Sequence, residues 1–198
     1  MTRINKGRPY PLGSSITSAG VNFSLIATNA EYVEILLFEK EDSISPKHIF
    51  KLDENNNTGP YWHAEIKNIK EGCIYAFRIK QKNNDINKNY EKKVLLDPCS
   101  RGITGWTNYK RENALKTKEN TNTCLKSVVC ERKSFNFKDY PRPKHSWEET
   151  IIYELHIKAF TESTDGDESC CKKFLKKIPY LKELGITTIE LLPIFCFD

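Results

Sequence analysis

The chain has 198 residues, which is enough for one or two modest domains. Hydrophobic residues make up 38% and charged residues 29% of the sequence, the proportions of an ordinary, somewhat polar soluble protein. The net charge of +5 is spread among 31 basic and 26 acidic residues, so no concentrated basic patch argues for nucleic-acid binding. No segment resembles a signal peptide and no apolar run is long enough to span a membrane, so we expect neither nucleic acid nor membrane as a partner.

The seven cysteines are scattered, odd in number and without paired CxxC spacing. Free thiols without a secretion signal predict a reducing, cytoplasmic location. The adjacent residues Cys170 and Cys171 admit two interpretations, a redox or metal site and two small residues in the first turn of a helix. The second is favoured, and no metal site or cofactor is predicted.

Short apolar runs separated by turn signals occupy most of the first hundred residues. Residues 1–18 are punctuated by proline and glycine, and we expect no regular element there. Alternating or β-rich runs with turns between them predict an antiparallel β-sandwich over residues 1–100. The expected strands are Val21–Leu25, Val33–Phe38, His48–Leu52, Tyr61–Ile66 and Ile74–Lys80.

The alternation also predicts which side chains face the core of this sandwich. In the run Tyr61–Ile66, Trp62 is in register with two apolar residues, whereas Tyr61 lies on the polar side. The core is expected to contain Phe23, Leu25, Trp62, Ala64, Ile66, Tyr75 and Phe77.

Residues 101–149 show no sustained periodicity, and we interpret them as an ordered linker at a domain interface. Aromatic residues are expected to anchor this linker: Trp106, Phe135, Phe137 and Trp147.

Residues 150–198 have the pattern strand, helix, strand. The apolar runs Ile151–Ile157 and Ile186–Ile194 do not alternate, which suits parallel strands covered on both faces. Between them Phe174, Ile178, Leu181 and Leu184 recur at helical spacing. Asp165 and Glu168 are expected to begin that helix as a capping box, and Gly185 is expected to end it.

Several segments carry a resemblance to a known family. The early segments are similar to carbohydrate-binding module family 48, the immunoglobulin-like sandwich of debranching and branching enzymes. They are Pro11-Leu12-Gly13, Gly20-Val21-Asn22-Phe23-Ser24, Val33–Phe38 and Gly72–Arg78, and Leu95-Leu96-Asp97-Pro98 resembles the segment by which such enzymes leave the module.

The last quarter resembles the first two barrel strands and first helix of glycoside hydrolase family 13, nearest to its isoamylase and glycogen-debranching branch. The matching segments are Ile152–Thr161 and Tyr180–Ile194. The resemblance implies residues 150–198 as the start of a (β/α)₈ TIM barrel, incomplete within this chain. It also implies hydrolysis of α-1,6-glucosidic branch linkages in glycogen or starch, with an α-glucan polysaccharide as partner.

No catalytic residue of that family falls within these 198 residues, because the resemblance places its carboxylates on later strands. Glu154 and Glu190 lie inside the two apolar runs, before the strand ends where barrel active sites form. A buried or partnered structural role is therefore favoured for both. We expect the chain alone to be inactive and to represent the N-terminal part of a longer enzyme. Alternatives are a branching enzyme or pullulanase, and a non-catalytic α-glucan-binding or scaffold protein.

Three further features admit a functional and a structural interpretation. His156 is either a substrate contact or ligand near a strand end or a hydrogen-bonded structural residue, and the second is favoured. Asp165-Gly166-Asp167-Glu168 lacks the rest of a calcium loop. Tyr61 and Trp62 are the candidate sugar-binding residues, since flat rings stack on pyranoses, although the register of Trp62 favours the core.

Overall fold

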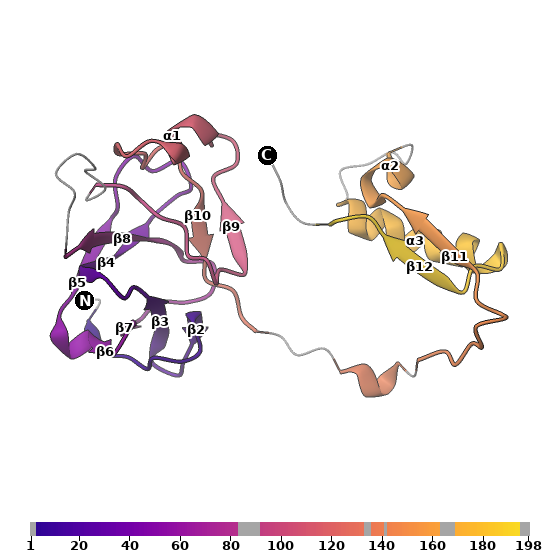
Figure 1. The fold of residues 1–198 in the computed structure, drawn as a ribbon, viewed down its shortest axis with the longest axis horizontal. Coiled ribbons are helices and arrows are strands. Elements are labelled where there is room, and N and C mark those ends of the chain that lie inside the picture. The colour runs from indigo at the N-terminus through magenta and orange to yellow at the C-terminus, as the bar shows by residue number, and fades with distance from the viewer. Residues whose placement is uncertain (1–2, 83–91, 133–135, 141, 163–168, 195–198) are drawn as a thin grey trace. The chain divides into compact units, whose positions relative to one another are not determined.

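The computed structural model describes residues 3–82, 92–132, 136–140, 142–162 and 169–194. The chain divides into two compact units, Met1–Ser134 and Phe135–Asp198. The first unit contains two five-stranded sheets, and the second contains a two-stranded sheet (Figure 1).

Every pairing in the first unit is antiparallel, as the sequence predicts for a sandwich. The first sheet has the order β1-β7-β3-β2, with β6 paired to β7. Its strands are β1 (Ile4–Lys6), β2 (Gly13–Ile16), β3 (Gly20–Ile26), β6 (Asn57–Thr58) and β7 (Tyr61–Lys67). The second sheet has the order β5-β4-β8-β10-β9. Its strands are β4 (Ala30–Phe38), β5 (His48–Leu52), β8 (Ile74–Gln81), β9 (Gly102–Thr104) and β10 (Lys126–Val128).

The core between the two sheets contains the side chains that the alternation predicts. All seven are at most 7% exposed and belong to one apolar cluster: Phe23, Leu25, Trp62, Ala64, Ile66, Tyr75 and Phe77. Burying each large apolar side chain contributes about 1.5–3 kcal/mol, so this cluster supplies much of the stability of the first unit. The predicted register is therefore confirmed.

The outer face of the second sheet is also covered, by a segment that the sequence analysis assigned partly to the linker. A second apolar cluster joins Leu36, Phe38 and Ala76 of the sheet to Val94 and Cys124. The short helix α1 (Arg111–Leu115) lies in the same segment, in the first unit (Figure 1). Val94 and Cys124 of the segment 93–125 thus cover this face of the sheet, and we call that segment the covering segment.

The expected linker over residues 101–149 therefore differs from the structure in its first half. Strand β10 pairs with β8 through Ser127 and Tyr75, and β9 pairs with β10. Lys126 and Ser127 are fully buried, with Lys126 Nζ donating to the Glu41 carbonyl oxygen at 2.8 Å. These strands are too short to show a period, and distant residues bury them, which explains why the sequence pattern hides them.

The outer face of the first sheet is polar yet buried, because the N-terminal segment crosses it. The Asn22 side chain bonds both the amide and the carbonyl of Arg8, at 2.7 and 3.0 Å, and Ser24 Oγ donates to the Pro9 carbonyl at 2.7 Å. Residues 1–18 were expected to lack regular structure, whereas they supply β1 and β2. Backbone pairing with β7 and β3 stabilises these strands despite the proline and glycine around them.

The second unit is a parallel strand pair with one long helix, as predicted for residues 150–198. Strands β11 (Ile152–Leu155) and β12 (Thr188–Leu191) pair in parallel, and α3 (Cys170–Glu183) lies between them in sequence. Figure 1 shows α3 running alongside the two strands. A small cluster of Leu155, Phe174 and Leu181 joins helix to sheet.

The end of α3 confirms the role expected of Gly185. Its φ is +87°, the Gly185 amide donates to the Lys182 carbonyl at 3.1 Å, and the Ile186 amide donates to the Leu181 carbonyl at 3.0 Å. This pair of bonds is a Schellman motif, in which the left-handed glycine lets two terminal carbonyls find donors. The expected capping box at Asp165 and Glu168 lies outside the described residues, and the N-cap is Ser169.

Other expectations for the second half of the chain differ in detail. The first strand ends at Leu155, and a short helix α2 (Ile157–Thr161) begins where the apolar run was expected to continue as strand. Of the four helical core positions, Ile178 and Leu184 are 38% and 55% exposed. Of the expected anchors, Phe137, in the short 3₁₀ helix η2 (Phe137–Asp139), is 71% exposed and Trp147 is 87% exposed, while Phe135 lies outside the described residues. No helix among the described residues is long and apolar enough to cross a membrane.

Candidate functional site

Trp62 of β7 lies in the sandwich core and offers no free ring face. Its side chain is 7% exposed, and the indole Nε1 donates to the Ala27 carbonyl at 3.1 Å. The neighbouring Tyr61 is half-buried at the beginning of the same strand, where it pairs with Ile26 and Thr58. Of the two sugar-binding candidates, Tyr61 alone has a ring that solvent reaches to more than a small extent.

A hollow of about 320 Å³ lies beside Trp62 at one end of the sandwich. Its polar side chains include Glu31, Glu54 and Lys82, which can exchange hydrogen bonds with hydroxyl groups. Apolar contact comes from Ala27, Ala30 and the edge of Trp62 rather than from an open aromatic face. The hollow has the donors and acceptors of a sugar site but lacks a stacking platform.

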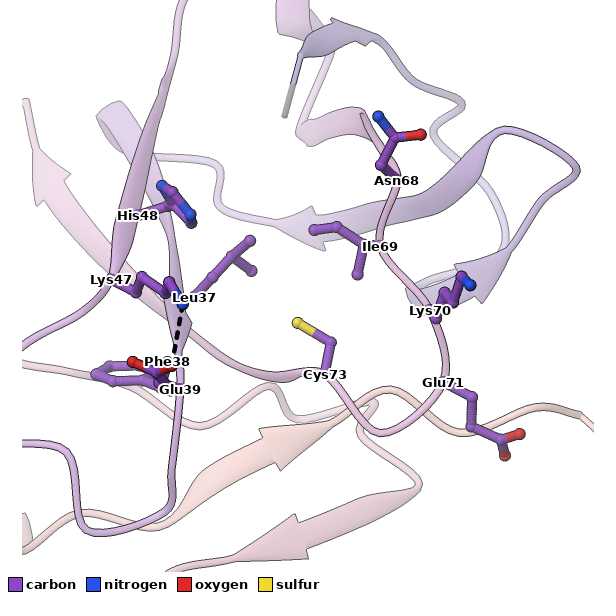
Figure 2. Close-up of a pocket in the computed structure, with 10 residues that line it drawn as sticks. All are labelled: Leu37, Phe38, Glu39, Lys47, His48, Asn68, Ile69, Lys70, Glu71 and Cys73. Carbon is purple, nitrogen blue, oxygen red and sulfur yellow. Dashed lines mark hydrogen bonds and ion pairs between the residues drawn. The ribbon is translucent and has the colours of Figure 1, made fainter. Parts of the chain in front are cut away.

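A second hollow, of about 420 Å³, is drawn in Figure 2. Leu37, Ile69 and Cys73 supply its apolar side, and Lys47 Nζ bonds Glu39 Oε1 at 3.1 Å across its rim. Burial raises the pKa of the Cys73 thiol, which keeps it protonated and weakly nucleophilic. The arrangement therefore offers no activated group for covalent chemistry.

Glu154 and Glu190 occupy register positions opposite each other on the parallel strands β11 and β12. Each alternates with residues that pack toward α3, so the two carboxylates lie on the other face of the strand pair. Both were expected to be buried or partnered, whereas both are exposed, because no described element of the second unit covers that face. Each also precedes the last residue of its strand, which agrees with a position away from a barrel rim.

His156 has a structural role at the junction between β11 and α2. It is the N-cap of that helix, and its Nδ1 accepts the Ala159 amide at 3.2 Å. Cys170 and Cys171 are exposed in the first turn of α3, and no group of three or more metal-ligating side chains occurs in the part of the chain that the structure describes. Asp165-Gly166-Asp167-Glu168 lies outside that part.

An aromatic pair, the exposed Trp106 and the half-buried Tyr109, lies on the turn after β9, and of the two only Trp106 was expected from the sequence, as a linker anchor. Trp106 is 40% exposed, and its ring centroid is 5.8 Å from that of Tyr109 with the planes at 74°. The signal in the sequence is Gly105-Trp106 followed by Tyr109, a glycine turn that carries two aromatic residues. The sequence alone did not indicate that the residues before Gly105 form a strand, so it did not show that the two aromatic residues lie on a turn of the sandwich.

Comparison with known proteins finds a family match within the first unit. Residues 11–100 match carbohydrate-binding module 48, described as the isoamylase N-terminal domain. The whole chain aligns with a glycogen debranching enzyme of Erwinia tasmaniensis at 31% identity over 211 residues, which is 31% of that protein. A glycogen debranching enzyme of Pectobacterium atrosepticum is 28% identical over 98% of the chain and 30% of its own length. The chain thus spans about a third of the length of these relatives.

Solved structures agree in fold. The catalytic module of the pneumococcal glycogen-degrading protein SpuA superimposes with a TM-score of 0.69 at 18% identity, over 97% of this chain and 28% of that one. The Group B Streptococcus pullulanase SAP, solved with maltotetraose, gives a TM-score of 0.69 at 21% identity, over 94% and 24%. Residues 11–100 therefore match the carbohydrate-binding module 48 family, and the chain resembles part of proteins named glycogen debranching enzyme, in agreement with the resemblance that its sequence carries.

Proposed function

We propose that the protein to which these residues belong hydrolyses α-1,6-glucosidic branch linkages of glycogen or starch. The observation that carries the proposal is the order of the two structural units along the chain. A carbohydrate-binding module 48 sandwich is followed by the parallel β11-α3-β12 unit, and relatives named glycogen debranching enzyme align over both. Hydrolysis with retention needs a carboxylate nucleophile and a carboxylic acid about 5–5.5 Å apart. We assign neither role to a residue of this chain.

The second unit is proposed to begin a (β/α)₈ barrel. Parallel strands joined through a helix are the repeating element of that fold, and their apolar residues are normally covered on both faces. Here apolar side chains in and next to the strands remain exposed, as expected if further strands and helices are needed to cover them. Ile151, Ile152, Leu191 and Leu192 are 38–53% exposed.

The partner in this proposal is an α-glucan. The pullulanase related in fold was solved with maltotetraose, and that glucan chemistry is carried to this chain as a proposal only. The proposal places the sandwich in residues 1–100, a connecting segment in 101–149 and the barrel start in 150–198, with the covering segment and β10 extending the sandwich toward residue 134. A cytoplasmic location is part of the same proposal, supported by six free cysteines among the described residues.

The test is a substrate comparison with the complete protein that carries these residues, beside a polypeptide limited to residues 1–198. The complete protein is expected to release reducing ends from amylopectin and to leave linear amylose intact. The 198-residue polypeptide is expected to release none, because two strands cannot form the eight-stranded barrel at whose rim the site would assemble. Release from amylose, or turnover by residues 1–198 after host amylases are removed, would overturn the proposal.

The alternatives give different results in the same assays. A branching enzyme alters the iodine absorbance of amylose without releasing reducing ends, and a pullulanase also cleaves pullulan. A non-catalytic glucan-binding protein would retain amylopectin in a pull-down and release nothing.

A further inference from the structure

We propose that the Trp106 indole, supported by Tyr109, is a stacking platform for an α-1,4-glucan chain on the sandwich. This inference rests on the proposed function, because it names the surface by which the first unit would hold the same polymer. The platform is defined as residues 105–109, the turn that follows β9. Trp106 lies outside the two hollows described above.

Exposure together with a place on the sandwich distinguishes Trp106 from the other two tryptophans. The chain has three: Trp62 is buried in the core, and Trp147 belongs to the second unit rather than to the sandwich. Trp106 is therefore the tryptophan that is both on the sandwich and reached by solvent. Flat aromatic rings combine a large apolar area with few rotatable bonds, and the apolar faces of pyranose rings can stack on them.

The turn that carries the platform is fixed on both sides. Gly105 adopts a φ of +99°, where an added Cβ would lie 3.0 Å from the Cys124 carbonyl oxygen. The Glu41 carboxylate accepts hydrogen bonds from Thr104 Oγ1 and from the Gly105 amide. After the turn, the Lys110 amide donates to the Thr123 carbonyl at 3.2 Å. The backbone on either side of Trp106 is thus ordered before any ligand arrives.

The position of Glu41 is fixed by a hydrogen bond from Lys126 of β10. The buried Lys126 donates from Nζ to the Glu41 carbonyl oxygen, and its ammonium lies 5.0 Å from the centroid of the Phe38 ring. The two hydrogen bonds from Thr104 and Gly105 hold the pKa of the Glu41 carboxyl below its usual range, so at neutral pH the carboxylate remains charged and able to accept both. Binding to a turn whose backbone is already ordered loses less conformational entropy than binding to a mobile one.

The ring arrangement suits a ligand that stacks. Tyr109 meets Trp106 with the planes at 74°, and one edge-on partner cannot cover both faces of an indole. Thr107 and Asn108, which lie between Trp106 and Tyr109 in the sequence, are exposed and carry a hydroxyl and an amide. These groups can bond the hydroxyls at the rim of a pyranose while its apolar face meets the indole.

Other surfaces of the sandwich are less suitable. The outer face of the second sheet around Leu36 and Ala76 is covered by the chain itself. Among the other rings, Tyr32 has Lys51 Nζ 3.9 Å above its centroid, so that face is already occupied by a cation. Among the described residues, Tyr10 is also exposed on the first unit, but the aromatic turn combines an exposed tryptophan, a fixed backbone and polar neighbours.

The experiment is a titration of the 198-residue chain with maltoheptaose, followed by tryptophan fluorescence and by calorimetry. Trp106→Ala is expected to weaken binding by about ten-fold or more, and Trp106→Phe to retain part of the affinity because a flat ring remains. Trp147→Ala is the matched control, since it removes an exposed tryptophan from the second unit and should leave affinity unchanged. Cellohexaose, a β-1,4-glucan of different shape, should bind more weakly.

Equal affinity of Trp106→Ala and the unsubstituted chain overturns the inference, as does absence of binding by the unsubstituted chain at millimolar maltoheptaose. A third outcome also overturns it: in the complete protein, Trp106 emission that is blue-shifted and insensitive to iodide would identify a contact between domains. None of these results affects the reducing-end assay of the complete protein, so the proposed hydrolase activity is judged separately. A circular dichroism melt of each variant establishes that a lost affinity does not reflect unfolding.

Discussion

The hydroxyl of Tyr75 on β8 donates a 2.6 Å hydrogen bond to Asp97 Oδ2, and both side chains are at most 2% exposed. The bond holds the segment around Asp97 against β8. Asp97 Oδ1 also accepts a hydrogen bond from the Cys99 amide at 2.8 Å. Burial raises the pKa of the Asp97 carboxyl, while both hydrogen bonds oppose that rise.

Replacing Tyr75 by Phe is expected to lower the free energy of unfolding by about 1.5–3 kcal/mol, the range for a hydrogen bond to a charged group. The ring and its edge contacts with Phe23 and Phe77 remain, so the loss reports the hydroxyl. Urea denaturation measures it. Tyr10→Phe, at a residue 77% exposed, is the control and should change stability by less than about 0.5 kcal/mol. Equal stability of Tyr75→Phe and the unsubstituted chain would contradict the role given to this bond.

A polypeptide ending at residue 100 is expected to be less stable than one ending at residue 134. The shorter form lacks β9, β10 and Cys124, so it partly uncovers Leu36, Phe38 and Ala76 and leaves β8 paired with β4 on one side only. Uncovering large apolar side chains costs about 1.5–3 kcal/mol each. Thermal melts and amide proton spectra compare the two. A dispersed spectrum and an equal melting temperature for the shorter form would show that the covering segment contributes nothing.

Acidification is expected to destabilise the sandwich through His63. This side chain is 1% exposed, its Nε2 bonds Thr58 Oγ1 at 2.8 Å, and its Nδ1 has no hydrogen-bond partner among the described residues. Burial, and then the positive charge of Lys6, lower the pKa of the imidazole. The unfolded chain therefore binds this proton more readily, and stability that is complete above about pH 6.5 is lost as pH falls through the lower folded pKa.

The measurement is the free energy of unfolding at pH 7.5 and 5.5 for the unsubstituted chain, His63→Gln and His48→Gln. His63→Gln is expected to flatten the pH dependence, whereas His48→Gln, at an exposed residue, is expected to preserve it. The same slope in all three proteins would place the responsible group elsewhere.

Substitutions of Tyr61 and Trp62 are expected to separate packing from binding. Trp62→Ala removes a core side chain and the bond to Ala27, and should cost about 3–5 kcal/mol. Tyr61→Ala, at a half-buried strand end, should cost about 1 kcal/mol and leave maltoheptaose affinity unchanged. Calorimetric titration tests the second statement, and a loss of affinity in Tyr61→Ala without a change in melting temperature would identify Tyr61 as the sugar contact instead.

Local physics made part of this fold predictable. Alternation in β3 and β7 identifies the face toward the core because side chains alternate along any strand, and Gly185 identifies the end of α3 because the left-handed conformation favours glycine. The boundary at Leu155 was not predictable, since a continuous apolar run does not distinguish a strand from the helix that follows. Polar Asn22 and Ser24 are buried under Arg8 and Pro9, and no periodicity reveals which segment covers a polar face.

The candidate site was less predictable than the fold. Sequence register correctly favoured the core for Trp62, whereas the expectation that no catalytic carboxylate lies within this chain remains a prediction. The setting of Trp106 depends on β9 and β10, whose burial arises from pairing with β8 and from the Lys126 contact to Glu41. Those contacts join residues far apart in the chain, which is why a reading of neighbouring residues missed them.

The pairing of β1 has a consequence for the order of events during synthesis. Ile4 pairs with Ile66, so β1 lacks this partner until β7, which is made later, has left the ribosome. At roughly 5–20 residues per second that interval lasts several seconds. In the meantime β2 and β3 can form their local hairpin, whose outer polar residues Asn22 and Ser24 are covered by Arg8 and Pro9 in the folded protein. Pairing of β1 is thus a late step in the assembly of the first sheet, although β1 precedes its partner in the chain. A nascent chain halted before β7 would expose β3 as an unpaired edge.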